Sequence, residues 1–286
     1  MAKPPRPRRS APRHGAAPGR RPPRAAGSPP PRRPSAAKGL GGEQVEGRQA
    51  VRELLLAGRR KVRELWVATE GEERGGPTEI LALAEDLRIP VQHVSRKRLD
   101  SEARSEAPQG VLAKAVPLEE ADLDDLARRT GKRVPFLVLV DGVTDPGNLG
   151  AILRSADGAG VTGVVLPRHR AVHITPTAAK AAAGAIEHVP IAIVSGLASA
   201  VERLRKAGVW VVGLDDAADH TLFELTDTAT EPIALVLGAE GTGLSRLVRE
   251  RCDLVVSIPM RGRLASLNVS AAAALACYEV ARRRLA

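Results

Sequence analysis

Five polar side chains that could do chemistry follow three apolar runs of the chain. Asn148 and Arg154 come after FLVLV, Glu240 comes after IALVLG, and Ser266 and Asn268 come after DLVVSI. An arginine can stabilise negative charge on a phosphate or a forming oxyanion, while amides, hydroxyls and carboxylates can hold a polar substrate. The ordinary alternatives are helix caps, a solvated charge for the arginine and an ion pair for the glutamate. We interpret the five together as a candidate site.

The last of these segments, Ile258 to Glu279, is the most informative stretch of the sequence. A strand expected over 253–258 ends at Pro259, and a glycine-containing loop with two arginines follows. We expect a helix from Ala265 onward, and its run of alanines predicts close packing and burial. Three polar residues within five positions at the helix start are more than one cap requires, which favours a functional role for them.

Regularly spaced apolar runs in the second half of the chain predict strands that alternate with helices. The expected strands are 136–140, 163–167, 189–194, 209–214, 233–238 and 253–258, and the expected helices are 148–157, 176–187, 197–207, 243–252 and 265–284. This alternation indicates an α/β fold with a parallel sheet covered on both faces. Ligands of such sheets bind beyond the carboxyl ends of the strands, so the loops 141–148, 238–243 and 259–268 are the candidates.

The first 42 residues differ in composition from the rest of the 286-residue chain. They hold 11 of the 22 prolines and 11 of the 43 lysines and arginines, but none of the 33 acidic residues. Because so little apolar surface is available, we interpret residues 1–42 as a disordered basic tail. Such an arm is typical of proteins with a polyanion partner, most simply RNA, although a role in solubility alone is an alternative.

A small α/β domain is predicted over 43–116, between the tail and the regular α/β segment. The expected helices are 47–57, 79–88 and 96–104, and the expected strands are 62–68, 91–94 and 110–116. We interpret residues 117–133 as a linker and residues 134–286 as a second domain.

Several classes of protein are disfavoured by what the sequence lacks. No apolar run approaches the roughly 20 residues of a membrane span, and no signal peptide is apparent, so we expect a cytoplasmic protein. Cys252 and Cys277 have no metal-type spacing and are expected to be reduced. His169 and His173 lie outside any expected helix, so we assign no metal site. The nucleotide-binding motif G-x-x-x-x-G-K-[ST] does not occur either.

Three motifs resemble those of the SpoU branch of the knotted SPOUT methyltransferases. They are NLGAILR (148–154), LGAEGTGLS (237–245) and IPMRGRLASLNVSAAAALACYE (258–279). The resemblance covers 136–286, and residues 43–116 are similar to the ribosomal-protein-L30-like substrate domain of the ribosomal RNA members. The overall likeness is to the type that methylates a guanosine 2′-oxygen in 23S ribosomal RNA. Ala265 is a departure, because many relatives carry a polar residue there.

This resemblance implies a fold, a cofactor and roles for individual residues. The fold would be a parallel sheet with a C-terminal deep trefoil knot, and the protein would be a homodimer with both chains at each RNA site. S-adenosylmethionine would be held mainly by backbone groups of Gly238, Ile258 and Leu267. Arg154 would stabilise the ribose alkoxide or a neighbouring phosphate, since a guanidinium holds its proton too tightly to act as a base. Asn148, Glu240, Ser266 and Asn268 would position the ribose, the arginine and the loops.

RNA recognition is expected to depend on lysine and arginine rather than on stacking. Three of the few aromatic residues, Phe136, Trp210 and Tyr278, lie in predicted strands or in the predicted buried helix, so we expect them in the core. The basic turns Arg59-Arg60-Lys61 and Arg96-Lys97-Arg98 are candidate phosphate contacts, although each could be a solvated loop.

Other functions remain open at this point. Within the same chemistry, the substrate could be transfer RNA, or the protein could be a resistance-type ribosomal RNA methyltransferase. From a different class, the chain could be an RNA-binding or ribosome-assembly factor without catalysis. Residues 43–116 favour ribosomal over transfer RNA, and the set Asn148, Arg154, Glu240 and Asn268 favours an enzyme.

Overall fold

The computed structural model describes residues 40–69, 77–169 and 174–285. Residues 1–39 of the predicted tail lie outside the described residues, so the disorder of this segment stays a prediction. His173 also lies outside the described residues. Leu40 is buried, and the backbone N–H of Gly42 donates to the carbonyl of Ile174 at 3.1 Å. The folded part of the chain therefore includes residues before the predicted boundary at residue 43, because Leu40 has apolar neighbours to pack against.

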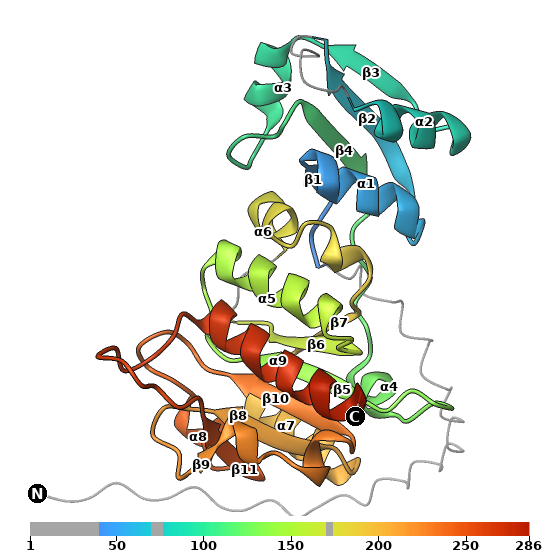
Figure 1. Cartoon of the computed structure of the whole chain (residues 1–286). Coiled ribbons are helices and arrows are strands. Elements are labelled where there is room, and N and C mark those ends of the chain that lie inside the picture. Colours follow the sequence, from blue (N-terminus) through green and yellow to red (C-terminus); the bar gives the residue numbers. More distant parts are fainter. Residues whose placement is uncertain (1–39, 70–76, 170–173, 286) are drawn as a thin grey trace, which may run out of the picture. The chain divides into compact units, whose positions relative to one another are not determined.

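The first part of the described chain is a small four-stranded α/β unit (Figure 1). Its elements in chain order are β1 (Gln44–Glu46), α1 (Arg48–Ala57), β2 (Val62–Ala68), α2 (Thr78–Asp86), β3 (Val91–Val94), α3 (Arg96–Glu102) and β4 (Val111–Ala115). The strand order is β1-β4-β2-β3, with β2 and β3 parallel and the other pairs antiparallel. Helices α1 and α2 cover one face of this sheet, and Leu99 of α3 packs against Trp66 on the other. The sequence predicted these helices and all strands except β1.

The second part contains a seven-stranded sheet in which every neighbouring pair is parallel. Its strands are β5 (Phe136–Val140), β6 (Gly163–Pro167), β7 (Ile191–Val194), β8 (Trp210–Leu214), β9 (His220–Thr221), β10 (Ile233–Leu237) and β11 (Leu254–Ser257). They are ordered β7-β6-β5-β10-β8-β11-β9 across the sheet. The predicted parallel sheet is confirmed, and only the two-residue β9 was not expected.

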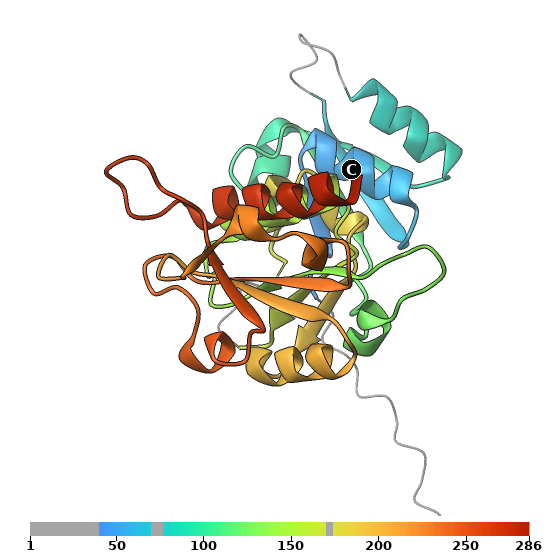
Figure 2. The same cartoon turned by 60° about the horizontal axis from the view of Figure 1, so that its bottom comes forward.

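Helices cover both faces of this sheet, as Figure 2 shows. They are α4 (Leu123–Ala127), α5 (Pro146–Gly158), α6 (Pro176–Ala181), α7 (Leu197–Lys206), α8 (Arg246–Arg249) and α9 (Val269–Leu285). Side chains of a strand alternate between faces. Phe136, Val138 and Val140 of β5 therefore pack with α5, α6 and α9, whereas Leu137 and Leu139 pack with α4, α7 and α8. The fully apolar run FLVLV is explained by burial on both sides.

Three predicted helices have different limits in the structure. The helix expected over 176–187 breaks after α6, because Ala183 and Gly184 adopt positive φ angles of 49° and 92°. The helix expected over 243–252 is reduced to α8, because the loop that follows β10 extends to Ser245. We call this loop, residues 238–245, the glycine loop. The helix expected from Ala265 begins at Val269, and the residues before it form an exposed loop.

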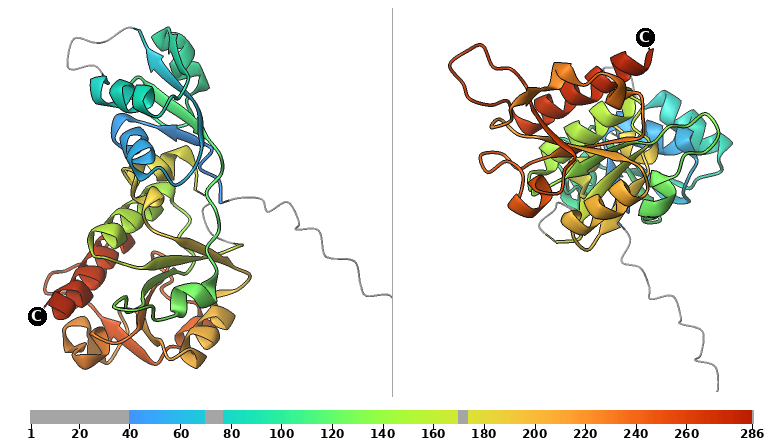
Figure 3. Two further views of the ribbon diagram at one scale, coloured as in Figure 1. Left: turned by 90° about the vertical axis from the view of Figure 1, so that its right-hand side faces the viewer. Right: turned by 90° about the horizontal axis from the view of Figure 1, so that it is seen from below.

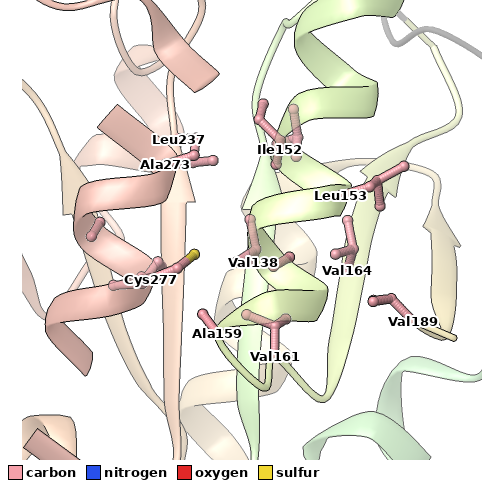
Figure 4. Packing of buried hydrophobic residues seen from close by; sticks show 14 of the residues in the cluster. Val138, Ile152, Leu153, Ala159, Val161, Val164, Val189, Leu237, Ala273 and Cys277 are labelled. Atoms are coloured by element: carbon pink, nitrogen blue, oxygen red, sulfur yellow. The ribbon is translucent and has the colours of Figure 1, made fainter. Parts of the chain in front are cut away.

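Helix α9 buries only one of its sides. Ala273, Ala276 and Cys277 pack against α5 and the sheet, and Figure 4 shows Ala273 and Cys277 near Ile152 and Val138. Tyr278 is 53% exposed, although its hydroxyl lies beside Gly158 at the end of α5. The prediction that Tyr278 belongs to the core was therefore wrong, as it was for Trp210, which is 47% exposed at the first position of β8, whereas Phe136 is buried as expected. No helix of the described chain is both long and apolar enough to cross a membrane.

The approach of α5 to α6 depends on a residue without a side chain. A Cβ at Gly150 would lie 2.4 Å from the Cβ of Ala181 and 2.6 Å from the carbonyl oxygen of Ala178. These distances are well inside van der Waals contact, so the two helices can approach this closely only because residue 150 is glycine. Gly150 thereby helps to hold α5, which carries Asn148 and Arg154, in its place.

We predict that Gly150→Ala destabilises the protein by about 1–3 kcal/mol through overpacking. The higher helix propensity of alanine would by itself stabilise α5 by up to about 1 kcal/mol, so the sign of the change tests the clash. Urea unfolding followed by circular dichroism measures the difference. Gly262→Ala is the control, because a Cβ there meets no atom within 4 Å. Equal stability of the two variants would contradict the packing argument.

Candidate functional site

The loops that carry the candidate residues meet at one edge of the seven-stranded sheet. Strands β5, β10, β8 and β11 are consecutive neighbours and run in the same direction, so their carboxyl ends lie side by side. The segments that follow β5, β10 and β11 hold the candidate residues. Strand order therefore brings together residues that are far apart in the sequence.

The carboxylate of Glu240 joins these three segments. Its Oε1 atom accepts hydrogen bonds from the Nδ2 of Asn268 at 2.7 Å and from the Nδ2 of Asn148 at 3.1 Å. The backbone N–H of Val269, at the start of α9, lies 3.5 Å from the same oxygen. Asn268 also donates to the Oδ1 of Asn148 at 3.0 Å. The three predicted residues thus form one hydrogen-bonded cluster, which we call the Asn148–Glu240–Asn268 cluster.

Asn148 is free to join this cluster because another residue caps its helix. The sequence predicted a helix that begins at Asn148, but the Oδ1 of Asp145 caps it by accepting the bond from the backbone N–H of Asn148 at 2.7 Å. Pro146 occupies the first turn, where a missing N–H costs nothing. The helix therefore begins earlier than predicted, and the side chain of Asn148 points to other partners.

Asn268 similarly performs two tasks at the start of α9. Its Oδ1 accepts hydrogen bonds from the backbone N–H of Ser270 at 2.8 Å and from the hydroxyl of Ser270 at 2.6 Å. These bonds satisfy groups that a helix start leaves unpaired. Because its Oδ1 is occupied in this way, the amide nitrogen of Asn268 is directed toward Glu240 and Asn148.

A cleft of about 600 Å³ lies beside the cluster. Gly238, Ile258 and Leu267, which the resemblance assigned to the cofactor, all line this cleft, as do Ser266 and Met260. A Cβ at Gly238 would lie 2.3 Å from the backbone carbon of Gly243, so no other residue fits there without moving the loop. Much of the wall is therefore backbone and apolar side chain, with polar groups at a few positions.

Within the described chain, all charged residues that line the cleft are acidic. They are Asp215, Asp216 and Glu240. Asp215 follows β8 and accepts a bond of 2.5 Å from the guanidinium of Arg249 and one of 3.0 Å from the N–H of Ala217. Burial by itself raises the pKa of Asp215, but these donors outweigh it, so its pKa lies below the ordinary value. Because Asp215 is paired with Arg249, the uncompensated negative charge at the cleft comes from Asp216 and Glu240.

Sequence reasoning missed the two aspartates that hold the glycine loop. Asp141, directly after β5, accepts a 2.8 Å bond from the backbone N–H of Ser245. Asp215 lies on the other side of the loop and is paired with Arg249 of α8. It is close to the loop, since a Cβ added at Gly243 would lie 3.1 Å from its Oδ2 atom. Both aspartates come immediately after a predicted strand, and this position was the signal that could have found them.

Arg154 does not belong to this cleft in its own chain. It lies on the exposed side of α5, in the half of the helix beyond Asn148, and it does not line the cleft. Within the described parts of the chain it has no hydrogen bond or ion pair. Its catalytic role stays a prediction, as do the roles of the other site residues.

The basic turns of the small unit are partly used within the protein. Arg60 forms a buried two-pronged pair with Glu187 at 2.9 and 2.5 Å, and Arg59 donates to the carbonyls of Glu187 and His188. Arg60 is therefore unavailable as a phosphate contact, whereas Arg59 is exposed and uses only one of its nitrogens in these bonds. In the second turn, Arg98 lies 5.2 Å from the ring centre of Trp66.

Asp215 gives a prediction about stability and pH. Because its pKa is lowered by folding, it stabilises the protein above its unfolded pKa of about 3.9 and loses this effect as pH falls through the folded pKa. Asp215→Asn should lower the free energy of unfolding by about 1–3 kcal/mol at pH 7, near the lower end because Arg249 is partly exposed. The difference from the unmodified protein should shrink below about pH 4.

Urea unfolding at pH 7 and at pH 3 measures both effects. Asp216→Asn is the matched control, since Asp216 also lines the cleft but makes no hydrogen bond or ion pair within the described chain. A pH-independent difference for Asp215→Asn would show that the carboxylate charge is not responsible.

Comparison with known proteins agrees with this architecture. Residues 135–278 match the model of the SpoU rRNA Methylase family, and residues 44–121 match the model described as RNA 2'-O ribose methyltransferase substrate binding. No group of three or more histidine, cysteine, aspartate or glutamate residues within the described chain could hold a metal ion.

Individual relatives are similar over most of their length. The chain is 42% identical to the putative TrmH family tRNA/rRNA methyltransferase YacO of Bacillus subtilis, over 85% of this chain and 96% of that protein. It is also 42% identical to the 23S rRNA (guanosine-2'-O-)-methyltransferase RlmB of Photorhabdus laumondii, over 85% and 98%. The SpoU methyltransferase AviRb of Streptomyces viridochromogenes, solved in complex with AdoMet, is 30% identical with a TM-score of 0.69, over 85% and 90%. With a matching family model, relatives of this identity and a cleft at the carboxyl ends of its strands, the chain belongs to the SpoU rRNA methylase family.

Proposed function

We propose that this protein transfers a methyl group from S-adenosylmethionine to the ribose 2′-oxygen of a guanosine in 23S ribosomal RNA. The observation that carries the proposal is the Asn148–Glu240–Asn268 cluster beside an acid-lined cleft. The name of the RlmB relative supports the nucleotide and the RNA, and the substrate-binding match over 44–121 supports an RNA partner.

The residues of the cleft fit S-adenosylmethionine. This cofactor carries a cationic sulfonium and an ammonium group, and Asp216 and Glu240 supply negative charge beside it, while Asp215 is paired with Arg249. Gly238 and its loop leave backbone accessible, while Ile258 and Leu267 offer apolar surface. When bound, the cofactor supplies a methyl carbon that is already activated by the positive sulfur.

The chain must then align the acceptor and manage one proton. With the cofactor and the RNA bound, the chain would hold the ribose 2′-hydroxyl where it can accept the methyl group, and the hydroxyl proton would leave to solvent. Orientation can supply a large part of the rate, and the hydrogen bonds of the Asn148–Glu240–Asn268 cluster would hold its side chains in place for this. Glu240 has two asparagine donors fixed on one oxygen, so its second oxygen can hold a polar group of the substrate or the cofactor.

Arg154 is proposed to stabilise the oxygen as its proton leaves. A guanidinium holds its proton in proteins, so its contribution is electrostatic. Because Arg154 lies outside the cleft of its own chain, we propose a homodimer in which each chain presents Arg154 to the cleft of the other. The exposed side of α9, with Leu275 46% and Tyr278 53% exposed, supports α9 as the surface between the chains.

Finer features of the fold are also proposals. A deep trefoil knot is supported by the path of the chain, in which α9 follows β11 yet packs against α5 and β10 on the far side of β8. Residues 44–116 have the mixed four-stranded sheet that a ribosomal-protein-L30-like RNA-binding domain would need. A cytoplasmic location follows from a ribosomal RNA substrate.

The test of this function is ribose-methylation mapping of 23S RNA from cells with and without the gene. We expect one guanosine to lose its 2′-O-methyl group and to regain it when the gene is restored. Restoration by Asn268→Ala, whose amide bonds are removed, should fail if catalysis is the function and succeed if the protein is an assembly factor. Unchanged 23S marks together with a lost mark in transfer RNA would reassign the substrate.

We predict that Arg154→Ala lowers methyl transfer by at least about 100-fold, the usual effect of removing a group that stabilises a forming oxyanion. Binding of S-adenosylmethionine, measured by calorimetry, should be nearly unchanged, because Arg154 is proposed to act on the oxygen of the RNA rather than to hold the cofactor. Arg154→Lys should keep part of the activity, since it retains the charge but loses the planar fork. Normal turnover by Arg154→Ala would exclude the proposed role.

A further inference from the structure

The loop between β11 and α9 extends away from the body of the protein (Figures 1 and 3). All residues from Arg261 to Asn268 are exposed, and Leu264 is 75% exposed. Met260 and the segment 265–268 line the cleft, whereas the residues between them do not. The tip of the loop, 261–264, therefore lies at the mouth of the cleft.

Two arginines at this tip have no counter-charge within the described chain. Neither Arg261 nor Arg263 makes a hydrogen bond or ion pair with any residue in the parts of the chain that the structure describes. Three other arginines of the same domain are paired, Arg203 with Asp124, Arg249 with Asp215 and Arg251 with Glu202, whereas Arg154 is not paired in the described chain. Unpaired arginines at the mouth of a cleft are expected of a surface that binds an anionic partner.

The charge of the tip is opposite to the charge of the cleft. Acidic side chains line the interior, where a cationic cofactor fits, and two cationic side chains stand outside it. A ribose that enters the cleft must bring its flanking phosphates to this mouth, because phosphates are bonded to the sugar on both sides. The guanidinium fork matches phosphate oxygens in a two-pronged geometry.

We propose that Arg261 and Arg263 form a phosphate clamp that grips the RNA backbone next to the target ribose. This inference rests on the proposed function and names the contact through which the substrate is held. Gly262 separates the two arginines and has no atom near its Cβ position, so the tip has room to adjust to the backbone. The clamp binds without reading sequence, since phosphates are common to all nucleotides.

The experiment is the salt dependence of RNA binding by the double variant Arg261→Gln/Arg263→Gln. The probe is a single-stranded RNA oligonucleotide, and affinity is measured by fluorescence anisotropy over a range of salt concentrations. Each phosphate contact to a single strand contributes about 0.7 to the slope of log affinity against log salt. Loss of both contacts should therefore lower the magnitude of the slope by about 1.4.

The charge-matched control is Arg128→Gln/Arg203→Gln. These arginines are also exposed, but they pair with Asp125 and Asp124 and do not line the cleft. The control should leave the slope nearly unchanged. An equal decrease in both double variants would overturn the clamp, because the lower net charge would then be the cause. An unchanged slope in the tip variant would overturn it directly.

Two further measurements distinguish the clamp from a catalytic role and from a role in dimer formation. With transcribed 23S RNA as substrate, the tip variant should raise KM and leave kcat and cofactor affinity unchanged, because the contact is made equally before and during transfer. If the tip variant sediments as a monomer while the unmodified protein sediments as a dimer, the proposal is overturned. The two arginines would then contact acidic groups of a second copy rather than RNA phosphates. If the unmodified protein transfers no methyl group to RNA, the proposed function fails, while the salt slopes still decide whether the clamp exists.

Discussion

The carboxylate of Glu240 is the point on which the geometry of the site depends. It accepts hydrogen bonds from Asn148, 92 residues earlier, and from Asn268, 28 residues later. These three residues belong to segments that follow three different strands, so their side chains tie together the carboxyl ends of those strands. Because one oxygen of this exposed carboxylate accepts bonds from two side chains on different segments, the cluster constrains the positions of the loops.

Two aspartates complete this constraint from either side of β10. Asp141 follows β5 and binds the backbone of the glycine loop at Ser245, while Asp215 follows β8 and pairs with Arg249 beyond the same loop. The glycine loop is thus held between its two neighbouring strands. Such support explains how a loop with several glycines, each able to adopt many conformations, can present one shape to a ligand.

The distribution of charge divides the site into two environments. Carboxylates surround the cleft, whereas Arg154 and the arginines of the tip before α9 lie outside it, without a partner in the described chain. A cationic cofactor and an anionic nucleic acid need opposite surroundings, and the fold provides both within one edge of the sheet. Arg154 lies on α5 but does not line the cleft of its own chain.

The periodicity of apolar residues was sufficient to predict the parallel sheet, because burial on both faces leaves a local signature in each strand. It was less reliable where glycine loops and exposed helix faces decide the outcome, as at α8 and at the start of α9. Tyr278 shows the reason. Its helix has apolar residues on more than one side, and only packing against α5 selects the side that is buried.

By itself, the sequence determined the types of the elements, the identity of the polar residues after the strands and the motifs of the family. These are local properties, carried by neighbouring residues. The tertiary structure alone decided that β10 lies between β5 and β8, that Asp145 rather than Asn148 caps α5, and that Arg154 stays outside the cleft. Hydrogen bonds form only within about 3 Å, and the packing of distant segments sets those distances.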